Sequence, residues 1–223
     1  MIDKTVHSLA AAVADIRDGA TILIGGFGNA GMPSELIDAL VGHSARDLTI
    51  VNNNAGNADT GLAALLKTKR VRKILCSFPR QTDSWVFDGL YRTGEIELEL
   101  VPQGNLACRI EAAGAGLGAI FTPTGYGTLL AKGKETRRIN GRDYVLEMPI
   151  HGDYALIKAE RADRWGNLVY RKAARNFGPI MARAAKCTVA QVREIVPLGA
   201  LDPEVIVTPG IFVQRVVPVG KPQ

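Results

Sequence analysis

The stretch DGATILIGGFGNAGMP, from Asp18 to Pro33, decides how the rest of the chain is organised. Its first part, Thr21 to Ile24, is rich in β-branched residues, a glycine-rich turn follows, and Pro33 opens the helical pattern SELIDAL. This order predicts strand, glycine turn and helix. Glycine lets the backbone come within contact distance of a ligand, and a helix N-terminus offers unpaired N–H groups to an anion. The stretch therefore predicts a site for a phosphate or a carboxylate.

A dinucleotide site of the Rossmann type has to be weighed against this, because Gly26, Gly28 and Gly31 satisfy G-x-G-x-x-G. In such a site an acidic residue about 20 positions on lies at the end of the second strand, where it meets the ribose. Asp47 has the right distance but precedes its strand, whose far end carries asparagines. A tight turn that binds no ligand is the other alternative, and both stay open on the pattern alone.

Polar amides follow two of the predicted strands. DLTIVNNN reads as a buried parallel strand that ends in three asparagines, and Gln103 comes just after the alternating strand IELELV. Ligands of open α/β sheets bind at the carboxyl ends of strands. Asn53 and Asn54 could therefore contact a substrate or simply form an asparagine-rich turn. The Gln103 amide could bind a carbonyl or carboxylate, or cap the helix that follows it.

The whole chain predicts an α/β fold with an open, mostly parallel sheet flanked by helices. A helical stripe at 4–17 precedes the first strand, strands and helices alternate through the first half, and the second half is richer in strands. A polar, basic segment at 132–142 suggests a hairpin or a flexible excursion. With 223 residues and 47% hydrophobic composition, the chain can form one substantial core, so we expect a single domain over residues 1–223.

Composition argues against several classes of function. The net charge of +5 is spread along the chain and only 6% of residues are aromatic, so we expect no nucleic-acid partner. The cysteines and histidines are widely spaced, which predicts neither a disulfide framework nor a metal site. They are Cys76, Cys108, Cys187, His7, His43 and His151. No basic N-terminal region with an apolar core and no apolar run of about 18 residues is found, so we expect a cytoplasmic protein without a membrane span.

A resemblance to a known family narrows these possibilities. The run D-G-x-x-I-L-I-G-G-F-x-x-x-G-x-P resembles the signature of the A subunit of class I, 3-oxoacid-type coenzyme A transferases, and matches downstream extend the resemblance over almost the whole chain. They are NNAG at Asn53 to Gly56, PQGNLA at Pro102 to Ala107, TPTGYGT at Thr122 to Thr128 and ARNF at Ala174 to Phe177. Within the family, the sequence is more similar to the branch that uses 3-oxoadipate than to the branch that uses acetoacetate.

The resemblance also implies a chemistry and a partner. In this family a glutamate in an S-E-N-G-like motif attacks the thioester, and acyl-anhydride and glutamyl-thioester intermediates follow. No glutamate of this chain is flanked in that way, and neither G-x-S-x-G nor a Cys/His pair is present. We therefore expect no catalytic nucleophile here and a homologous B subunit that carries the glutamate, in an A2B2 heterotetramer. The coenzyme A thioester is a substrate, and no cofactor is expected.

The site residues follow from the resemblance as well. Backbone N–H groups of the glycine turn are expected to contact coenzyme A or the thioester oxygen, and Asn53, Asn54 and Gln103 to orient the acyl carboxylate. The turn residues are Gly25, Gly26, Phe27, Gly28, Asn29, Ala30 and Gly31. Arg80, after the third strand, is the candidate for the remote carboxylate of 3-oxoadipate. Its alternative is a surface arginine paired with Asp83.

Three functions remain open on the sequence alone. The chain is expected to be the A subunit of a succinyl-CoA:3-oxoadipate transferase of aromatic-compound breakdown. The alternatives are the A subunit of an acetoacetate-using transferase, or a ligand-binding relative without catalytic activity.

Overall fold

The computed structural model describes residues 2–219 and is built on an eight-stranded central sheet. The strand order is β11-β10-β8-β1-β2-β3-β4; these neighbours are all parallel, and β9 alone pairs antiparallel, with β8. The strands are β1 (Thr21–Ile24), β2 (Leu48–Val51), β3 (Val71–Cys76), β4 (Glu97–Leu100), β8 (Gly152–Asp163), β9 (Leu168–Val169), β10 (Ala185–Val196) and β11 (Arg215–Pro218). The predicted open, mostly parallel α/β sheet is confirmed.

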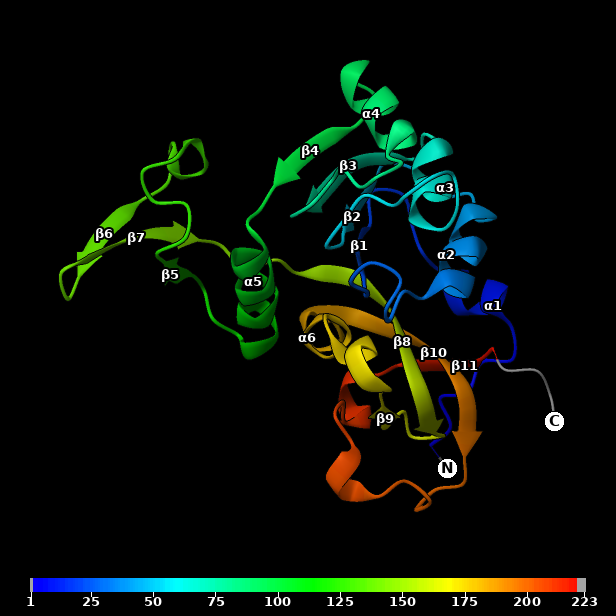
Figure 1. Ribbon diagram of the computed structural model, residues 1–223. Helices are drawn as coiled ribbons and strands as arrows, with labels where there is room; N and C mark the ends of the chain where they lie inside the picture. Colours follow the sequence, from blue (N-terminus) through cyan, green and yellow to red (C-terminus); the bar gives the residue numbers. More distant parts are fainter. Residues whose placement is uncertain (1, 220–223) are drawn as a thin grey trace.

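Helices cover both faces of this sheet (Figure 1). α1 (Leu9–Val13), α2 (Ser34–Val41), α3 (Leu62–Lys67) and α4 (Trp85–Arg92) lie on one face, and α5 (Gln103–Ala115) and α6 (Gly178–Ala184) on the other. Short 3₁₀ turns lie at Leu129–Ala131, Lys172–Arg175, Pro203–Val205 and Gly210–Phe212. Successive side chains of a strand point to opposite faces of the sheet. Ile22 and Ile24 therefore pack with the helices α1 to α4, and Leu23 packs with α5 and α6.

A small antiparallel sheet stands apart from the central one (Figure 1). It has the order β5-β7-β6 and contains β5 (Ile120–Thr122), β6 (Thr136–Ile139) and β7 (Arg142–Glu147). Asn140 and Gly141 join β6 to β7 with φ angles of 49° and 78°, which a two-residue hairpin turn with two left-handed positions requires. The polar segment at 132–142 is therefore a hairpin, and the second half is richer in strands, as expected.

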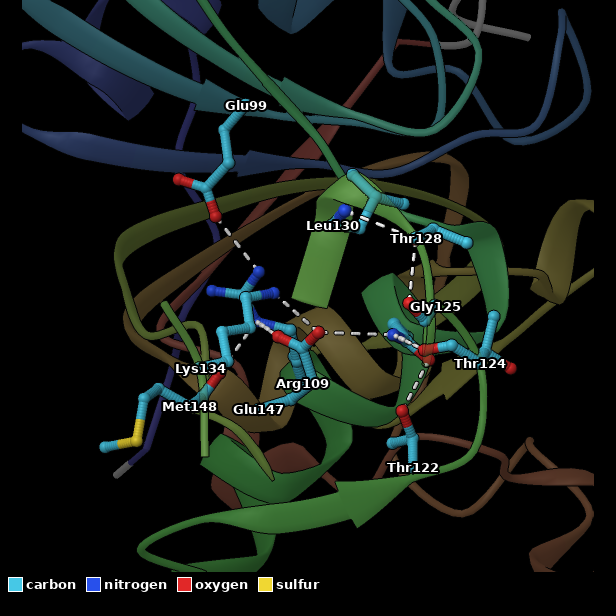
Figure 2. Close-up of polar contacts among 11 residues, drawn as sticks. Glu99, Arg109, Thr122, Thr124, Gly125, Thr128, Leu130, Lys134, Glu147 and Met148 are labelled. Atoms are coloured by element: carbon cyan, nitrogen blue, oxygen red, sulfur yellow. Dashed lines mark hydrogen bonds and ion pairs between the residues drawn. The ribbon is translucent and has the colours of Figure 1, made fainter. Parts of the chain in front are cut away.

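A buried carboxylate fastens the small sheet to α5 (Figure 2). Glu147 is only 3% exposed, and its Oε1 accepts hydrogen bonds from Lys134 Nζ at 2.7 Å and from Asn105 Nδ2 at 3.3 Å. Arg109 lies 3.8 Å from its other oxygen and also donates to Glu99 at 3.0 Å. A buried charge is tolerated only when it is paired and hydrogen-bonded. These contacts meet that condition and fix the small sheet on the helix.

The edge strand β4 is held by charges on its exposed side. Lys73 Nζ lies 2.9 Å from a carboxylate oxygen of both Glu97 and Glu99. Partial burial alone would raise the pKa of Glu99, but hydrogen bonds from Lys73 and Arg109 outweigh it, and the pKa lies below its ordinary value. The alternation of acidic and apolar residues in IELELV is typical of a half-exposed strand, and β4 has exposed and partly buried residues.

The first helix is shorter than the stripe at 4–17 predicted. Val6 N–H donates to Val216 O and Val216 N–H to Lys4 O, both at 2.8 Å, so the N-terminal residues run extended beside β11. Ser8 Oγ then accepts from Ala11 N–H at 3.1 Å and caps α1. Strand pairing with a distant segment overrides the local helical pattern here.

Within residues 2–219, no helix is both long and apolar enough to cross a membrane.

Candidate functional site

The glycine turn leaves β1 at the carboxyl edge of the central sheet and closes on itself. Phe27 N–H donates to Ala30 O at 3.0 Å and Ala30 N–H to Phe27 O at 3.2 Å, which places Gly28 and Asn29 at the tip. Gly28 has a φ of 57°, the left-handed conformation that glycine adopts without steric cost. The tip is therefore a narrow backbone loop that projects from the strand end.

Hydrogen bonds within the fold decide which amides of the turn are left for a ligand. Gly25 N–H donates to Leu156 O of β8 at 2.9 Å, and the Phe27 and Ala30 amides are used within the turn. In the part of the chain that the structure describes, the remaining amides donate to no protein acceptor. They are those of Gly26, Gly28, Asn29 and Gly31. The seven donors expected from the sequence thus reduce to four, of which those of Gly28 and Asn29 lie at the cavities described below, whereas Gly26 and Gly31 are buried.

The start of α2 is occupied by a side chain from the opposite half of the sheet. Leu36 N–H donates to Gln191 Oε1 at 3.1 Å, and Gln191 Nε2 donates to the carboxylate of Glu35. A carboxylate already lies at this helix end, which favours negative charge. The helix N-terminus is therefore not the open anion site that the sequence suggested, and only the turn keeps that role.

Asn52 joins the glycine turn to the neighbouring strand end. Its side chain is fully buried; Nδ2 donates to Ile24 O at 2.7 Å and Oδ1 accepts from Asn54 N–H at 2.9 Å. Sequence reasoning selected Asn53 and Asn54 and gave Asn52 no role. The sequence does contain a signal for Asn52. It is the first residue after the buried strand β2, and it therefore lies beside the end of β1, where a backbone carbonyl needs a donor.

The next two asparagines have different surroundings. Asn53 Oδ1 accepts a hydrogen bond from Gln103 Nε2 at 2.6 Å, so these two predicted residues lie together. Asn54 Oδ1 instead accepts from Gly56 N–H at 2.9 Å, which is the local turn that an asparagine-rich segment favours. Gln103 is the first residue of α5 and makes no side-chain capping bond there. Its amide is thus used to orient Asn53.

A cleft of about 880 Å³ at this edge of the sheet is lined by two residues of the glycine turn and by the predicted amides and Arg80. It is lined by residues from four segments, among them Phe27, Gly28, Asn53, Asn54, Arg80 and Gln103. A second cavity of about 580 Å³ shares Gly28 and Asn54 with it and continues over the segment 54–62. The two spaces meet at the tip of the glycine turn, so a long ligand could occupy both.

Arg80 lies on the wall of the larger cleft and is also ion-paired. Its side chain is 58% exposed, and Nε donates to Asp88 Oδ1 of α4 at 2.6 Å. The expected alternative partner, Asp83, is not the one used. Because the bond is made through Nε, no protein acceptor among residues 2–219 uses the two terminal nitrogens. The pairing is compatible with a second contact to a ligand carboxylate.

The cleft holds donors but no evident nucleophile. Within the described part of the chain, neither a carboxylate nor a cysteine lines the larger cleft. Cys76, at the end of β3, is buried, and burial raises the pKa of its thiol to about 12. Among residues 2–219 no group of three or more potential ligands could hold a metal ion. Two carboxylates, Asp38 and Asp59, line the second cavity only. The larger cleft can therefore polarise and orient a substrate but has no nucleophile of its own.

The chain is similar to known proteins along almost its whole length. The family model described as Coenzyme A transferase matches residues 6–218. The chain is 71% identical over 220 residues to the A subunit of 3-oxoadipate CoA-transferase from Pseudomonas putida, across 99% of this chain and 95% of that protein. It is 49% identical over 215 residues to the A subunit of succinyl-CoA:3-ketoacid coenzyme A transferase from Helicobacter pylori strain J99, across 96% and 92%.

A solved structure shares the fold. An acyl-CoA transferase of Escherichia coli O157:H7, crystallised as a thioester complex with CoA, superposes with a TM-score of 0.84 at 23% identity. The match covers 97% of this chain and 47% of that one, so the chain spans about half the length of the E. coli protein. At this identity the likeness concerns the fold alone.

Two glycines of the turn offer a matched pair of variants, because both have a positive φ. A Cβ on Gly31 would lie 2.6 Å from Ala174 O, whereas a Cβ on Gly28 meets no atom within 4 Å. We expect Gly31→Ala to lower the free energy of unfolding by about 1–3 kcal/mol more than Gly28→Ala does. Chemical denaturation of both variants measures this difference.

The same pair separates folding from ligand contact. Gly28→Ala should fold but bind coenzyme A at least about tenfold more weakly by calorimetry, since its methyl group would enter the cleft next to the free amides. Unchanged affinity in Gly28→Ala would show that the turn is structural only.

Proposed function

Since the chain belongs to the coenzyme A transferase family, we propose that it is the A subunit of an enzyme that transfers coenzyme A from succinyl-CoA to 3-oxoadipate. The identity of 71% with the Pseudomonas putida protein, against 49% with the 3-ketoacid relative of Helicobacter pylori, supports this choice of acceptor. The observation that carries the proposal is the cleft itself. Its wall contains the free amide of Gly28 and the oriented amide pair of Asn53 and Gln103, yet within residues 2–219 it contains no carboxylate to act as nucleophile.

The reaction proceeds through a glutamate that a B subunit contributes. Its carboxylate attacks the carbonyl carbon of succinyl-CoA, and the C–S bond breaks to release the coenzyme A thiolate and leave a mixed anhydride. The thiolate then attacks the glutamyl carbonyl and displaces succinate, which gives a glutamyl thioester. The carboxylate of the 3-oxo acid then attacks the glutamyl thioester and releases the coenzyme A thiolate, which leaves a second mixed anhydride. The thiolate attacks the 3-oxoacyl carbonyl of this anhydride, so the 3-oxoacyl-CoA forms and the glutamate carboxylate is released.

This chain stabilises the charge that develops in those steps. Each attack on a carbonyl places negative charge on its oxygen, and preorganised donors aimed at that oxygen are often the largest single contribution to catalysis. The free amides of Gly26, Gly28, Asn29 and Gly31 are our candidates for this role and for contact with coenzyme A. Asn53, held by Gln103, orients the acyl carboxylate through its Nδ2 group, and Asn54, whose Oδ1 is used in the local turn, lines the same cleft.

The assembly we propose is an A2B2 heterotetramer in which both chains contribute to one site. The relatives at 71% and 49% identity are both named as A subunits, which implies a second kind of subunit. We also propose that the chain forms one domain, because both hydrophobic cores pack on the same central sheet. Coenzyme A takes part as the substrate thioester, and the mechanism requires no further cofactor.

Two other functions are compatible with the same fold and glycine turn. Acetoacetate could be the physiological acceptor, since the A subunits of succinyl-CoA:3-ketoacid transferases are also close relatives. A ligand-binding relative that performs no chemistry would keep the same glycine turn. Activity with and without the B subunit, and the acceptor preference of an Arg80 variant, distinguish these functions.

The first concerns the partner. We expect the purified chain alone to transfer no coenzyme A from succinyl-CoA to 3-oxoadipate, because the glutamate is missing, and to become active when the B subunit of the same organism is added. Formation of 3-oxoadipyl-CoA, followed by chromatography, measures this. Turnover by the verified single chain contradicts the two-subunit mechanism, and inactivity of an assembled complex favours the ligand-binding alternative.

The second concerns Arg80 and the remote carboxylate. A bidentate contact from arginine to a carboxylate is a strong, charge-assisted one, so in the complex Arg80→Ala should lower kcat/KM for 3-oxoadipate about ten- to a hundredfold. The loss for acetoacetate, which has a methyl group at that end, should be small. Arg72→Ala, which removes an exposed arginine paired with Glu97 at 3.4 Å, is the control. Equal losses on both acceptors, or none on either, would remove Arg80 from the site.

A further inference from the structure

Ser77 begins the segment that leads from β3 to Arg80. It follows directly on β3, and its N–H donates to Asn53 O at 3.1 Å; the next amide, of Phe78, donates to the same oxygen at 3.0 Å. The Asn53 side chain is in turn fixed by Gln103. Ser77 is thus attached by its backbone to the amide pair of the site, and it lines the larger cleft.

The hydroxyl of Ser77 is the unusual feature. Its Oγ is buried and, among the described residues, is the one buried side-chain oxygen or nitrogen atom without a hydrogen-bond partner. Buried polar groups in folded proteins nearly always have a partner, and an exception calls for an explanation. The residue as a whole is only half-buried. Because Oγ makes no hydrogen bond within residues 2–219, rotation about the Cα–Cβ bond breaks none, and the residue lines the larger cleft.

Two other side chains that line the cleft near Ser77 already donate hydrogen bonds to protein acceptors. Gln103 Nε2 donates to Asn53 Oδ1, and Arg80 Nε donates to Asp88. The Ser77 hydroxyl, by contrast, forms no bond within residues 2–219. A ketone oxygen is an acceptor only, so a site that distinguishes a 3-oxo acid from a plain acid must supply a donor.

We propose that Ser77 is a specificity-determining residue that donates a hydrogen bond to the 3-oxo oxygen of the acyl substrate. The inference rests on the proposed function and adds to it. In a 3-oxo dicarboxylic acid the ketone lies nearer the reacting carboxylate than the remote carboxylate does. Ser77 lies at the strand end beside Asn53, and Arg80 follows three residues further out. The order of donor and cation along the segment matches the order of ketone and carboxylate along the substrate.

The test compares ligands that differ only in the 3-oxo group. In the assembled complex, kcat/KM is measured for 3-oxoadipate and acetoacetate, and the inhibition constants of adipate and butyrate are measured against 3-oxoadipate. A site that hydrogen-bonds a substrate oxygen discriminates strongly against loss of that bond. We expect Ser77→Ala to lower kcat/KM about tenfold or more for both 3-oxo acids and to change both inhibition constants by less than about threefold.

Three controls separate this role from a structural one. Ser77→Thr keeps the hydroxyl and should restore most of the lost activity. Thr82→Val removes a different hydroxyl from the wall of the same cleft and should not select between the two kinds of ligand. The melting temperature of Ser77→Ala should be unchanged, because the hydroxyl makes no bond in the folded chain within residues 2–219.

The possible outcomes are distinct. Selective loss on the 3-oxo acids supports the assignment. Equal weakening of all four ligands, or no change with any of them, overturns the role of Ser77 while leaving the transferase proposal intact. A wild-type complex that fails to convert 3-oxoadipate overturns the proposed function itself.

Discussion

The buried amide of Asn52 holds two strand ends together, and the geometry of the whole site depends on it. Parallel strands bond each other only while both continue, so the carbonyl of Ile24 would lack a partner just where the chain turns away. Asn52 supplies that partner with Nδ2 and uses Oδ1 to fix the amide of Asn54. A single side chain thereby sets the direction of the glycine turn and the course of the adjacent asparagine segment.

In the glycine turn next to Asn52, some backbone amides donate hydrogen bonds within the fold and others have no protein acceptor. Gly25 is bonded to β8 and the turn is closed between Phe27 and Ala30, yet four amides on the same turn have no protein acceptor within residues 2–219. Such donors are held rigidly by strands packed on both faces, so little reorganisation is needed when charge develops on a substrate oxygen. A chain built in this way supplies the positioning and the electrostatics of an active site, and its partner supplies the reacting group.

Local patterns were sufficient for most of the elements, the length of α1 excepted, but not for their partners. The glycine turn, the asparagine-bearing strand end and the hairpin at 132–142 follow from spacing and residue type, and the structure has all three. The occupied start of α2 could not be foreseen, because Gln191 comes from β10, far along the chain. The same holds for Gly25, whose amide is taken by β8, and for Arg80, whose partner on α4 is Asp88 and not the nearer Asp83. Tertiary contacts, which no local pattern contains, decide which donors are left for a ligand.

The central claim is that coenzyme A thioesters bind at the carboxyl edge of the sheet, against the tip of the glycine turn. The most direct test is a crystal structure of this chain assembled with its B subunit in the presence of a hydrolysis-resistant succinyl-CoA analogue. We predict that the ester carbonyl oxygen lies within hydrogen-bond distance of at least one free turn amide, those of Gly26, Gly28, Asn29 and Gly31, with the acyl chain in the cleft beside Asn53. Density for the analogue at the opposite edge of the sheet, in the cavity between Arg17 and Lys186, would contradict this claim.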